Sequence, residues 1–273
     1  MTLEEKRIRY EKSVKRAKKF ALNAVIVLVA VAASGMFIGY LTERLQAAAA
    51  EATYEDVRGD IVESGSHEIN FTVVQERGST STSWIYLPDT DIDYPMVQGP
   101  DNDMYLDVDA YGNPSKAGAI FINYANDKYM SDPKTVIFGH NMNDGSMFTP
   151  LHKYKDEEWG SVHSDAYIFT DDGMCKHYRL RYYIFTEPTD EAVYVVNNGD
   201  DAVMAAMKLR NEADIIYGEH TGGNLICLST CTYHTKRTVV VFEHVDNKKP
   251  IAGMSKKMAE ELSTSENTIG ETK

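Results

Sequence analysis

The first clear pattern in the chain is an unbroken apolar stretch over residues 20–42. These 23 residues read FALNAVIVLVAVAASGMFIGYLT and contain no Asp, Glu, Lys or Arg. A helix of this length, at about 1.5 Å per residue, spans about 34 Å, more than the roughly 30 Å hydrocarbon core of a bilayer. The pattern therefore predicts a membrane-spanning helix.

Residues 41–64 continue with an alanine-rich pattern that is compatible with a helix and then becomes acidic. Glycine and serine cluster at 65–66 and at 78–83, and such clusters are typical of loops. We therefore expect a stalk or packing helix after the membrane helix, followed by a looped connection.

Beyond residue 83 the pattern changes to short apolar, β-branched and aromatic runs bounded by turn residues, which is typical of strands. The runs are 84–87, 94–98, 119–122, 135–138, 166–170, 178–185, 224–231 and 237–245. One helix is predicted among them, at 200–211, where apolar residues recur at helical spacing. Many short strands with few helices predict a mainly β domain, a barrel or a sandwich, over residues 82–247.

Charge is distributed unevenly along the 273 residues, whose formal net charge is −13. Residues 1–19 hold eight basic and three acidic side chains, whereas the remainder holds 20 basic and 38 acidic ones. Such an acidic body repels phosphate backbones, so we expect no nucleic acid partner. Basic residues beside a membrane helix stay in the cytoplasm, which predicts a cytoplasmic N-terminus and an exported body.

A cleaved signal peptide is the main alternative to a retained anchor. The alanines at 47–50 offer a small-residue cleavage site. The apolar region of a signal peptide is only about 7–15 residues long, however, and this stretch is longer. The length favours the retained anchor, and the buried helix of a soluble protein is a weaker third interpretation.

Several kinds of chemistry lack support in the sequence. It contains no glycine-rich phosphate loop and no HExxH or CxxC zinc pattern. The acidic string between Asp101 and Asp109 does not fit a calcium loop, because counting from Asp107 places Gly118 where a glutamate ligand belongs. We therefore expect neither a metal nor another cofactor.

A hairpin around Cys231 is the most informative segment. Residues 225–231 read LICLSTC, residues 237–243 read RTVVVFE, and five residues connect them. Symmetric closure of this hairpin pairs Cys231 with Arg237, Ser229 with Val239 and Cys227 with Val241. A guanidinium beside a thiol favours the thiolate and can donate to an oxyanion. The alternative is a buried core cysteine beside a surface arginine.

A cysteine nucleophile also needs a group that handles protons. His234 is close in sequence, within the hairpin loop, and His140 follows the predicted strand 135–138 in the sequence FGHN. A histidine on a loop at a strand end is well placed to reach a site. The residues alone leave both histidines open.

Four motifs, in a consistent order, carry a family resemblance. LSTC at 228–231, followed by an arginine that leads a Val-rich strand, resembles the signature of the sortases. IFGHNMNDGSMF at 137–148 is similar to the histidine motif of their class B branch. WIYLPDTDIDYPMVQGPDNDMYL at 84–106 and KAGAIF at 116–121 also resemble that class. The resemblance covers residues 82–245.

The resemblance implies a fold and a set of site residues. The fold would be mainly β with flanking helices, a sortase-type closed β-barrel preceded by the transmembrane helix and a stalk helix. Cys231 would be the nucleophile, His140 the acid and base, and Arg237 the oxyanion or substrate-positioning residue, which favours His140 over His234. The expected substrate-binding residues are Asn102, Leu106, Tyr194, Val195, Ser229 and Thr230.

The chain departs from the family pattern at two places. Cys227 stands where the signature usually begins with Thr, and we expect it to have a packing role. The loop between Cys231 and Arg237 is shorter than in the class B pattern, which leaves loop contacts to substrate in doubt.

The resemblance also implies an activity and partners. Sortases are membrane-anchored cysteine transpeptidases of Gram-positive bacteria. The expected reaction cleaves a C-terminal sorting motif of secreted proteins through a thioacyl-enzyme and transfers the acyl group to an amine of a peptidoglycan precursor. The alternatives are a pilin-polymerising sortase that uses a lysine amine, a hydrolytic cysteine peptidase, and a membrane-tethered binding module without activity. A structural or pilin-like protein would not need the Cys-His-Arg set.

We expect a single-pass protein of the cell membrane with an extracellular catalytic domain. Its expected parts are a cytoplasmic basic segment at 1–19, the anchor at 20–42, the stalk region at 43–81, the catalytic domain at 82–247 and a polar tail at 248–273.

Overall fold

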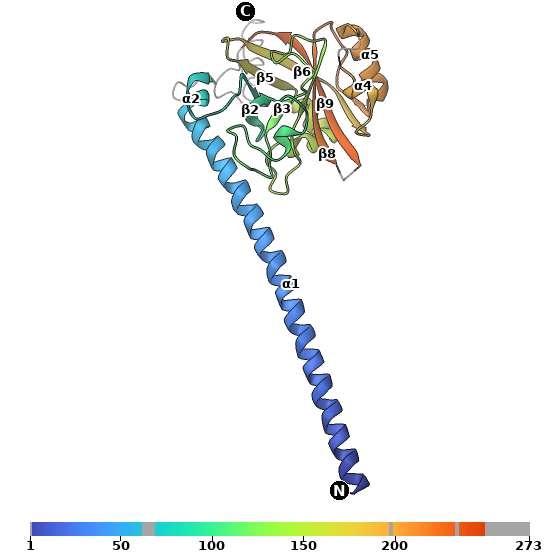
Figure 1. Ribbon diagram of the computed structural model, residues 1–273. Helices are drawn as coiled ribbons and strands as arrows, with labels where there is room; N and C mark the ends of the chain where they lie inside the picture. The colour runs from blue at the N-terminus through green and yellow to red at the C-terminus, as the bar shows by residue number, and fades with distance from the viewer. Residues whose placement is uncertain (1, 62–68, 197–198, 233–234, 249–273) are drawn as a thin grey trace, which may run out of the picture. The chain divides into compact units, whose positions relative to one another are not determined.

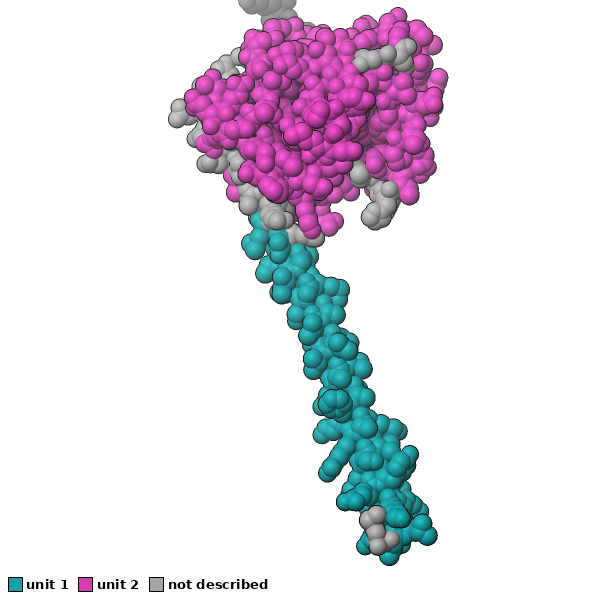
Figure 2. All heavy atoms as spheres, in the orientation of Figure 1, with its two compact units in different colours: residues 1–48 teal, residues 49–273 magenta. Residues whose placement is uncertain are grey.

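A computed structural model describes residues 2–61, 69–196, 199–232 and 235–248 (Figure 1). The chain divides into two compact units, Met1–Ala48 and Ala49–Lys273, which Figure 2 colours separately. His234, the predicted loop at 65–66 and the predicted tail beyond residue 248 lie outside the described residues.

The first unit holds most of helix α1, which extends over Leu3–Ile61 and continues into the second unit. Within the described residues this is the one helix long and apolar enough to cross a membrane, over Leu3–Thr42. Its apolar side chains, among them Phe20, Leu28 and Phe37, are exposed. A helix whose apolar side chains are exposed in this way is suited to be a membrane anchor. It contains the predicted anchor at 20–42.

The second unit is built on nine strands in its described residues. They are β1 (Ser83–Tyr86), β2 (Asp93–Gln98), β3 (Ile120–Ile122), β4 (Lys134–Phe138), β5 (Asp165–Thr170), β6 (Cys175–Thr186), β7 (Ile215–Ile216), β8 (Leu225–Thr232) and β9 (Lys236–Asp246). Their order is β5-β1-β2-β3-β4-β8-β9-β6-β7, and β5 also pairs with β6. That pairing closes eight strands into a barrel, with β7 added at β6, and confirms the predicted closed barrel.

Short helices flank the barrel. They are α2 (Phe71–Glu76), η1 (Met104–Leu106), η2 (Thr149–Lys155), α3 (Glu157–Val162), α4 (Glu191–Tyr194) and α5 (Ala202–Glu212). The sequence predicted only α5, because the others are too short to show a helical period. Asn70, Asp156 and Asp190 begin three of them, each side chain accepting hydrogen bonds from backbone N–H groups of the first turn.

Two apolar layers lie on the two faces of β8 and β9. Leu228, Val240 and Phe242 belong to the main core inside the barrel, whereas Cys227 and Val241 belong to a second layer under α4 and α5. Successive strand residues point to opposite faces, so strands buried on both sides are apolar throughout. Cys227 is fully buried, and burial raises the pKa of its thiol to about 12, which confirms the packing role expected for it.

A buried carboxylate on β9 fixes the segment that leads into β8. Glu243 is fully buried and accepts hydrogen bonds from Arg181, from the backbone N–H and hydroxyl of Thr221, and from Gly223 N–H. Burial alone raises the pKa of this carboxyl, but these hydrogen bonds outweigh it and hold the pKa below its ordinary value.

We expect Glu243→Gln to destabilise the protein by about 3 kcal/mol at pH 7, because the substitution leaves the Arg181 guanidinium buried without its counter-charge. Equilibrium urea unfolding of the full chain in detergent measures the change. Since the folded-state pKa is lowered, this contribution is present above the unfolded value of about 4.3 and is lost as the pH falls further. The difference between wild type and variant should therefore shrink in acid.

Glu219→Gln is the matched control, since Glu219 pairs with Arg210 on the surface and is 72% exposed. It should change stability by less than about 1 kcal/mol. Equal effects of the two substitutions would contradict the role assigned to Glu243.

Candidate active site

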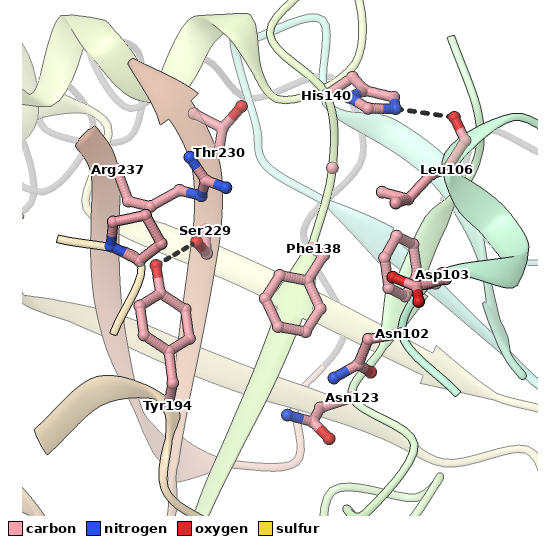
Figure 3. Close-up of a pocket in the computed structure, with 13 residues that line it drawn as sticks. Asn102, Asp103, Leu106, Asn123, Phe138, His140, Tyr194, Ser229, Thr230 and Arg237 are labelled. Carbon is pink, nitrogen blue, oxygen red and sulfur yellow. Dashed lines mark hydrogen bonds between the residues drawn. The ribbon is translucent and has the colours of Figure 1, made fainter. Parts of the chain in front are cut away.

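A pocket of about 330 Å³ opens where β4, β8 and β9 meet the segment around η1 and the segment that contains α4 (Figure 3). Seven of the residues predicted from the sequence line it: Asn102, Leu106, His140, Tyr194, Ser229, Thr230 and Arg237. They come from segments that are far apart in the sequence, so only the closed barrel brings them together.

One predicted residue lies elsewhere, and several lining residues were missed. Val195 lines a separate cavity of about 30 Å³ rather than this pocket. Sequence reasoning missed six lining residues: Asp103, Phe121, Asn123, Phe138, Gly139 and Pro188. Asp103 and Gly139 are direct neighbours of predicted residues and Phe138 is two positions from His140, and that closeness in sequence was the available signal.

The β8–β9 hairpin has the register that its sequence predicts. Cys231 pairs with Arg237, Ser229 with Val239 and Cys227 with Val241. The ladder extends one pair further, to Thr232 and Lys236, so the connection is shorter than the five residues expected. Position 231 therefore directly follows two residues that line the pocket and faces a third across the ladder.

His140 follows β4 and is held by backbone groups on both sides of the pocket. Its Nε2 lies 2.8 Å from the carbonyl oxygen of Leu106, and the N–H of the preceding Gly139 donates to Ser229 O at 3.1 Å. A carbonyl only accepts, so His140 Nε2 is the donor. Within the described part of the chain, Nδ1 has no hydrogen-bond partner and remains available for proton exchange.

Glycines allow the close approach of these backbones. Gly118 has φ +59, and a Cβ there would lie 2.5 Å from Tyr105 O and 2.7 Å from Leu106 O. A Cβ at Gly139 would lie 2.5 Å from a side-chain carbon of Ile120. The glycines of the KAGAIF and IFGHN segments thus let the Leu106 carbonyl and His140 meet.

Arg237 presents a positive charge on the opposite side of the pocket from Leu106 and Asp103 (Figure 3). The one hydrogen bond of its guanidinium to described residues goes to Lys236 O, at 3.2 Å. No acidic side chain in the described ranges forms an ion pair with it. A guanidinium without a counter-charge at a pocket wall is suited to bind an anion or a developing oxyanion.

Tyr194 and Ser229 form the wall between α4 and β8. The two hydroxyl oxygens lie 2.8 Å apart, and the Tyr194 ring stacks on Phe138 with 6.2 Å between centroids and 8° between planes. Burial raises the pKa of Tyr194 to about 12, so its phenol stays neutral at physiological pH. The pair is therefore a fixed polar contact rather than a proton donor for chemistry.

The comparisons with known proteins agree with this geometry. The sortase domain profile matches residues 85–245, which is more than half of the chain. The protein therefore belongs to the sortase family.

Within that family, the chain is similar to class B members. It is 34% identical over 122 residues to sortase B of Listeria monocytogenes, an alignment that covers 45% of this chain and 48% of that protein. The alignment thus spans about half the length of this relative. It is 25% identical over 180 residues to sortase B of Staphylococcus aureus, covering 63% of this chain and 72% of that one.

A crystal structure of sortase B from Bacillus anthracis superposes with a TM-score of 0.65. The match has 26% identity and covers 74% of this chain and 99% of that chain. The likeness therefore extends over the whole of that solved domain.

We expect Gly118→Ala to displace the Leu106 carbonyl from His140. A left-handed alanine costs about 1–2 kcal/mol, and the contacts of its Cβ with two carbonyl oxygens add to this cost. Thermal unfolding and the imidazole NMR signals of His140 measure both effects.

Gly112→Ala is the control, because Gly112 has φ +85 but open space around its Cβ position. Gly112→Ala should lower the free energy of unfolding only by the cost of a left-handed alanine backbone. Identical stability losses in the two variants, with an unchanged His140 spectrum, would refute the packing role of Gly118.

Proposed function

We propose that this protein is a membrane-anchored cysteine transpeptidase with Cys231 as its nucleophile, His140 as its acid and base, and Arg237 as its oxyanion-stabilising residue. The observation that carries the proposal is the ladder pair between Cys231 and Arg237 at the wall of a pocket that His140 also lines. Family membership supports it independently.

The reaction begins with the Cys231 thiolate attacking a backbone carbonyl of the substrate, which converts the carbonyl oxygen into an oxyanion. Arg237 lines the pocket without a described counter-charge, so it is free to stabilise that oxyanion. His140 as imidazolium protonates the leaving amine as the C–N bond breaks, and a thioester remains.

The second half of the reaction releases the acyl group. An incoming amine attacks the thioester, His140 accepts its proton, and the Cys231 thiolate leaves. Because Leu106 O holds Nε2 as a donor, we assign the transferred proton to Nδ1.

The proposed acyl donor is a C-terminal sorting motif of a secreted protein. An extended peptide segment fits a pocket open to solvent and lined by both apolar and amide side chains. Asn102, Leu106, Tyr194, Ser229 and Thr230 line the pocket and are the proposed contacts. We assign Val195 a weaker, indirect role, since it lines the neighbouring cavity.

The proposed acyl acceptor is an amine of a peptidoglycan precursor. The exposed carboxylate of Asp103 at the pocket wall favours the approach of a cationic amine. A pilin lysine offers the same chemistry and is the alternative acceptor, and water would make the protein a hydrolytic peptidase. A binding module without activity is the non-enzyme alternative.

We further propose that the N-terminus is cytoplasmic and the barrel extracellular. The eight basic residues within 1–19 support this orientation, since basic flanks of membrane helices stay inside. Anchoring enzyme, secreted substrate and lipid-linked acceptor at one membrane face raises their effective concentration.

Labelling of intact cells with a membrane-impermeant maleimide should modify Cys231 and spare the other two cysteines. Cys227 and Cys175 are both buried, and burial raises the pKa of Cys227 to about 12. Peptide mass mapping locates the label, and denatured protein provides the control in which all three cysteines react. Labelling that requires cell lysis would refute the orientation, and undiminished labelling of Cys231→Ala would refute the nucleophile.

A peptide library of candidate sorting motifs, incubated with and without amines, tests the activity itself. Wild type should form an acyl-enzyme and amine-linked products with a bell-shaped pH dependence, since one group reacts as thiolate and the other as imidazolium. Cys231→Ala should be inactive, His140→Gln should lose about 10²–10⁴-fold in kcat, and Arg237→Ala about 10²–10³-fold.

Mass spectrometry distinguishes the alternatives in that experiment. Products that do not depend on any amine would indicate a peptidase, and absence of an acyl-enzyme would indicate a binding module. Comparison of a peptidoglycan-type branched amine with a pilin-type lysine amine separates wall attachment from pilus assembly.

A further inference from the structure

The wall of the pocket beside Ser229 depends on α4, a helix of only four residues, Glu191–Tyr194. So short a helix does not hold its own conformation, because nucleation costs more than a single turn returns. Its place must therefore be set by contacts with the rest of the domain.

At the pocket end, two contacts hold α4. The Tyr194 hydroxyl bonds to Ser229 Oγ at 2.8 Å, and its ring stacks on Phe138 of β4. Between the two ends, Val193 is fully buried in the layer that also contains Val136 and Cys227.

At the other end, a buried lysine reaches the helix backbone. Lys134 is only 7% exposed, and its Nζ donates a hydrogen bond to the carbonyl oxygen of Ala192. The last four carbonyls of a helix have no partner within the helix, and in a helix of four residues these include Ala192 O. Lys134 therefore satisfies a carbonyl that α4 itself leaves unpaired. Asp190 completes this end by accepting from Ala192 N–H at 2.9 Å.

The strand β4 thus holds α4 at two points. Lys134 begins the strand and Phe138 ends it, and residues four apart in a strand share a face at a separation of about 13 Å. Burying an ammonium is costly, and burial lowers the pKa of Lys134. An apolar residue would fill the same space without that cost. The hydrogen bond to Ala192 O is thus the contact that distinguishes Lys134 from an apolar residue at this position.

We propose that Lys134 is a positioning residue of the active site, which holds α4 so that Tyr194 stays on Ser229 and the substrate-binding wall keeps its shape beside Cys231. The inference rests on the proposed transpeptidase function and deepens it. Lys134 does not line the pocket and acts through Ala192 and Tyr194.

Kinetics of the full chain in detergent test this role, with the library peptide that wild type processes fastest as substrate. Lys134→Met keeps the length of the side chain and removes the donor. We expect KM to rise about tenfold while kcat changes less than about threefold, since the substitution disturbs a binding wall and not the reacting groups. Lys134→Arg restores a cationic donor, and the adjacent cavity of about 30 Å³ leaves room for it, so KM should return toward wild type.

Lys208→Met is the matched control. Lys208 of α5 pairs with Asp200 and is 46% exposed, so its substitution removes an ammonium from the same neighbourhood without removing a described hydrogen bond to α4. Its KM should equal that of wild type. A rise in KM equal to that of Lys134→Met would show a general charge effect and overturn the proposal.

A double-mutant cycle tests whether Lys134 acts through Tyr194. Tyr194→Phe removes the hydroxyl that bonds to Ser229, and residues that act in one chain of contacts give non-additive effects. The KM of the double variant should therefore be no higher than that of the worse single variant. Fully additive effects would overturn the proposed route.

Hydrogen exchange separates this inference from the proposed function. In Lys134→Met, the amides of residues 191–195 should exchange faster while those of β8 keep their protection. This readout needs no substrate, so it still decides the role of Lys134 if wild type proves unable to transfer acyl groups. Unchanged exchange at 191–195 would overturn the proposal, and loss of protection throughout the barrel would assign Lys134 to global stability instead.

Discussion

The antiparallel pairing of β8 and β9 is the constraint on which the rest of the site depends. It sets the backbone of Cys231 opposite Arg237 and pairs the two residues before it, Ser229 and Thr230, with Val239 and Thr238. A shift of one residue in either strand would exchange the two faces of that strand relative to its partner and move its side chains into the opposite layer. Because both faces are buried over residues 225–230 and 238–243, each under its own apolar layer, the register of this hairpin is specified there.

The strand β9 shows how one element serves two electrostatic tasks. At its start, Arg237 faces the pocket and pairs with no acidic side chain among the described residues. Near its other end, Glu243 is fully buried and has its charge balanced by Arg181 and by backbone donors. The balanced charge of Glu243 holds the segment before β8, whereas the unbalanced charge of Arg237 is available to a ligand. The difference lies in the surroundings of each charge and not in the strand itself.

Much of the fold was accessible to sequence reasoning because strands are local patterns. The runs at 135–138 and 166–170 match β4 and β5 within one residue, and the hairpin register follows from its two strands and a short loop. The short helices were not predicted, because neither has a periodic apolar face: α4 is stabilised by the Asp190 cap and by tertiary contacts, and η2 by the burial of Leu151 and Tyr154. The placement of Val195 was unpredictable for the same reason, since it follows directly after α4.

The sequence by itself determined the apolar anchor, the apolar strand runs and the identity of the three candidate catalytic residues, because each depends on neighbouring residues or on a motif. Only the tertiary structure decided that the Leu106 carbonyl meets His140, that Arg237 lacks a described counter-charge, and that Lys134 holds a helix almost sixty residues away. Those contacts join segments far apart in the chain, and the closure of the barrel through the β5–β6 pair completes the frame that carries them. Local pattern contains no information about which distant backbone group a side chain will reach.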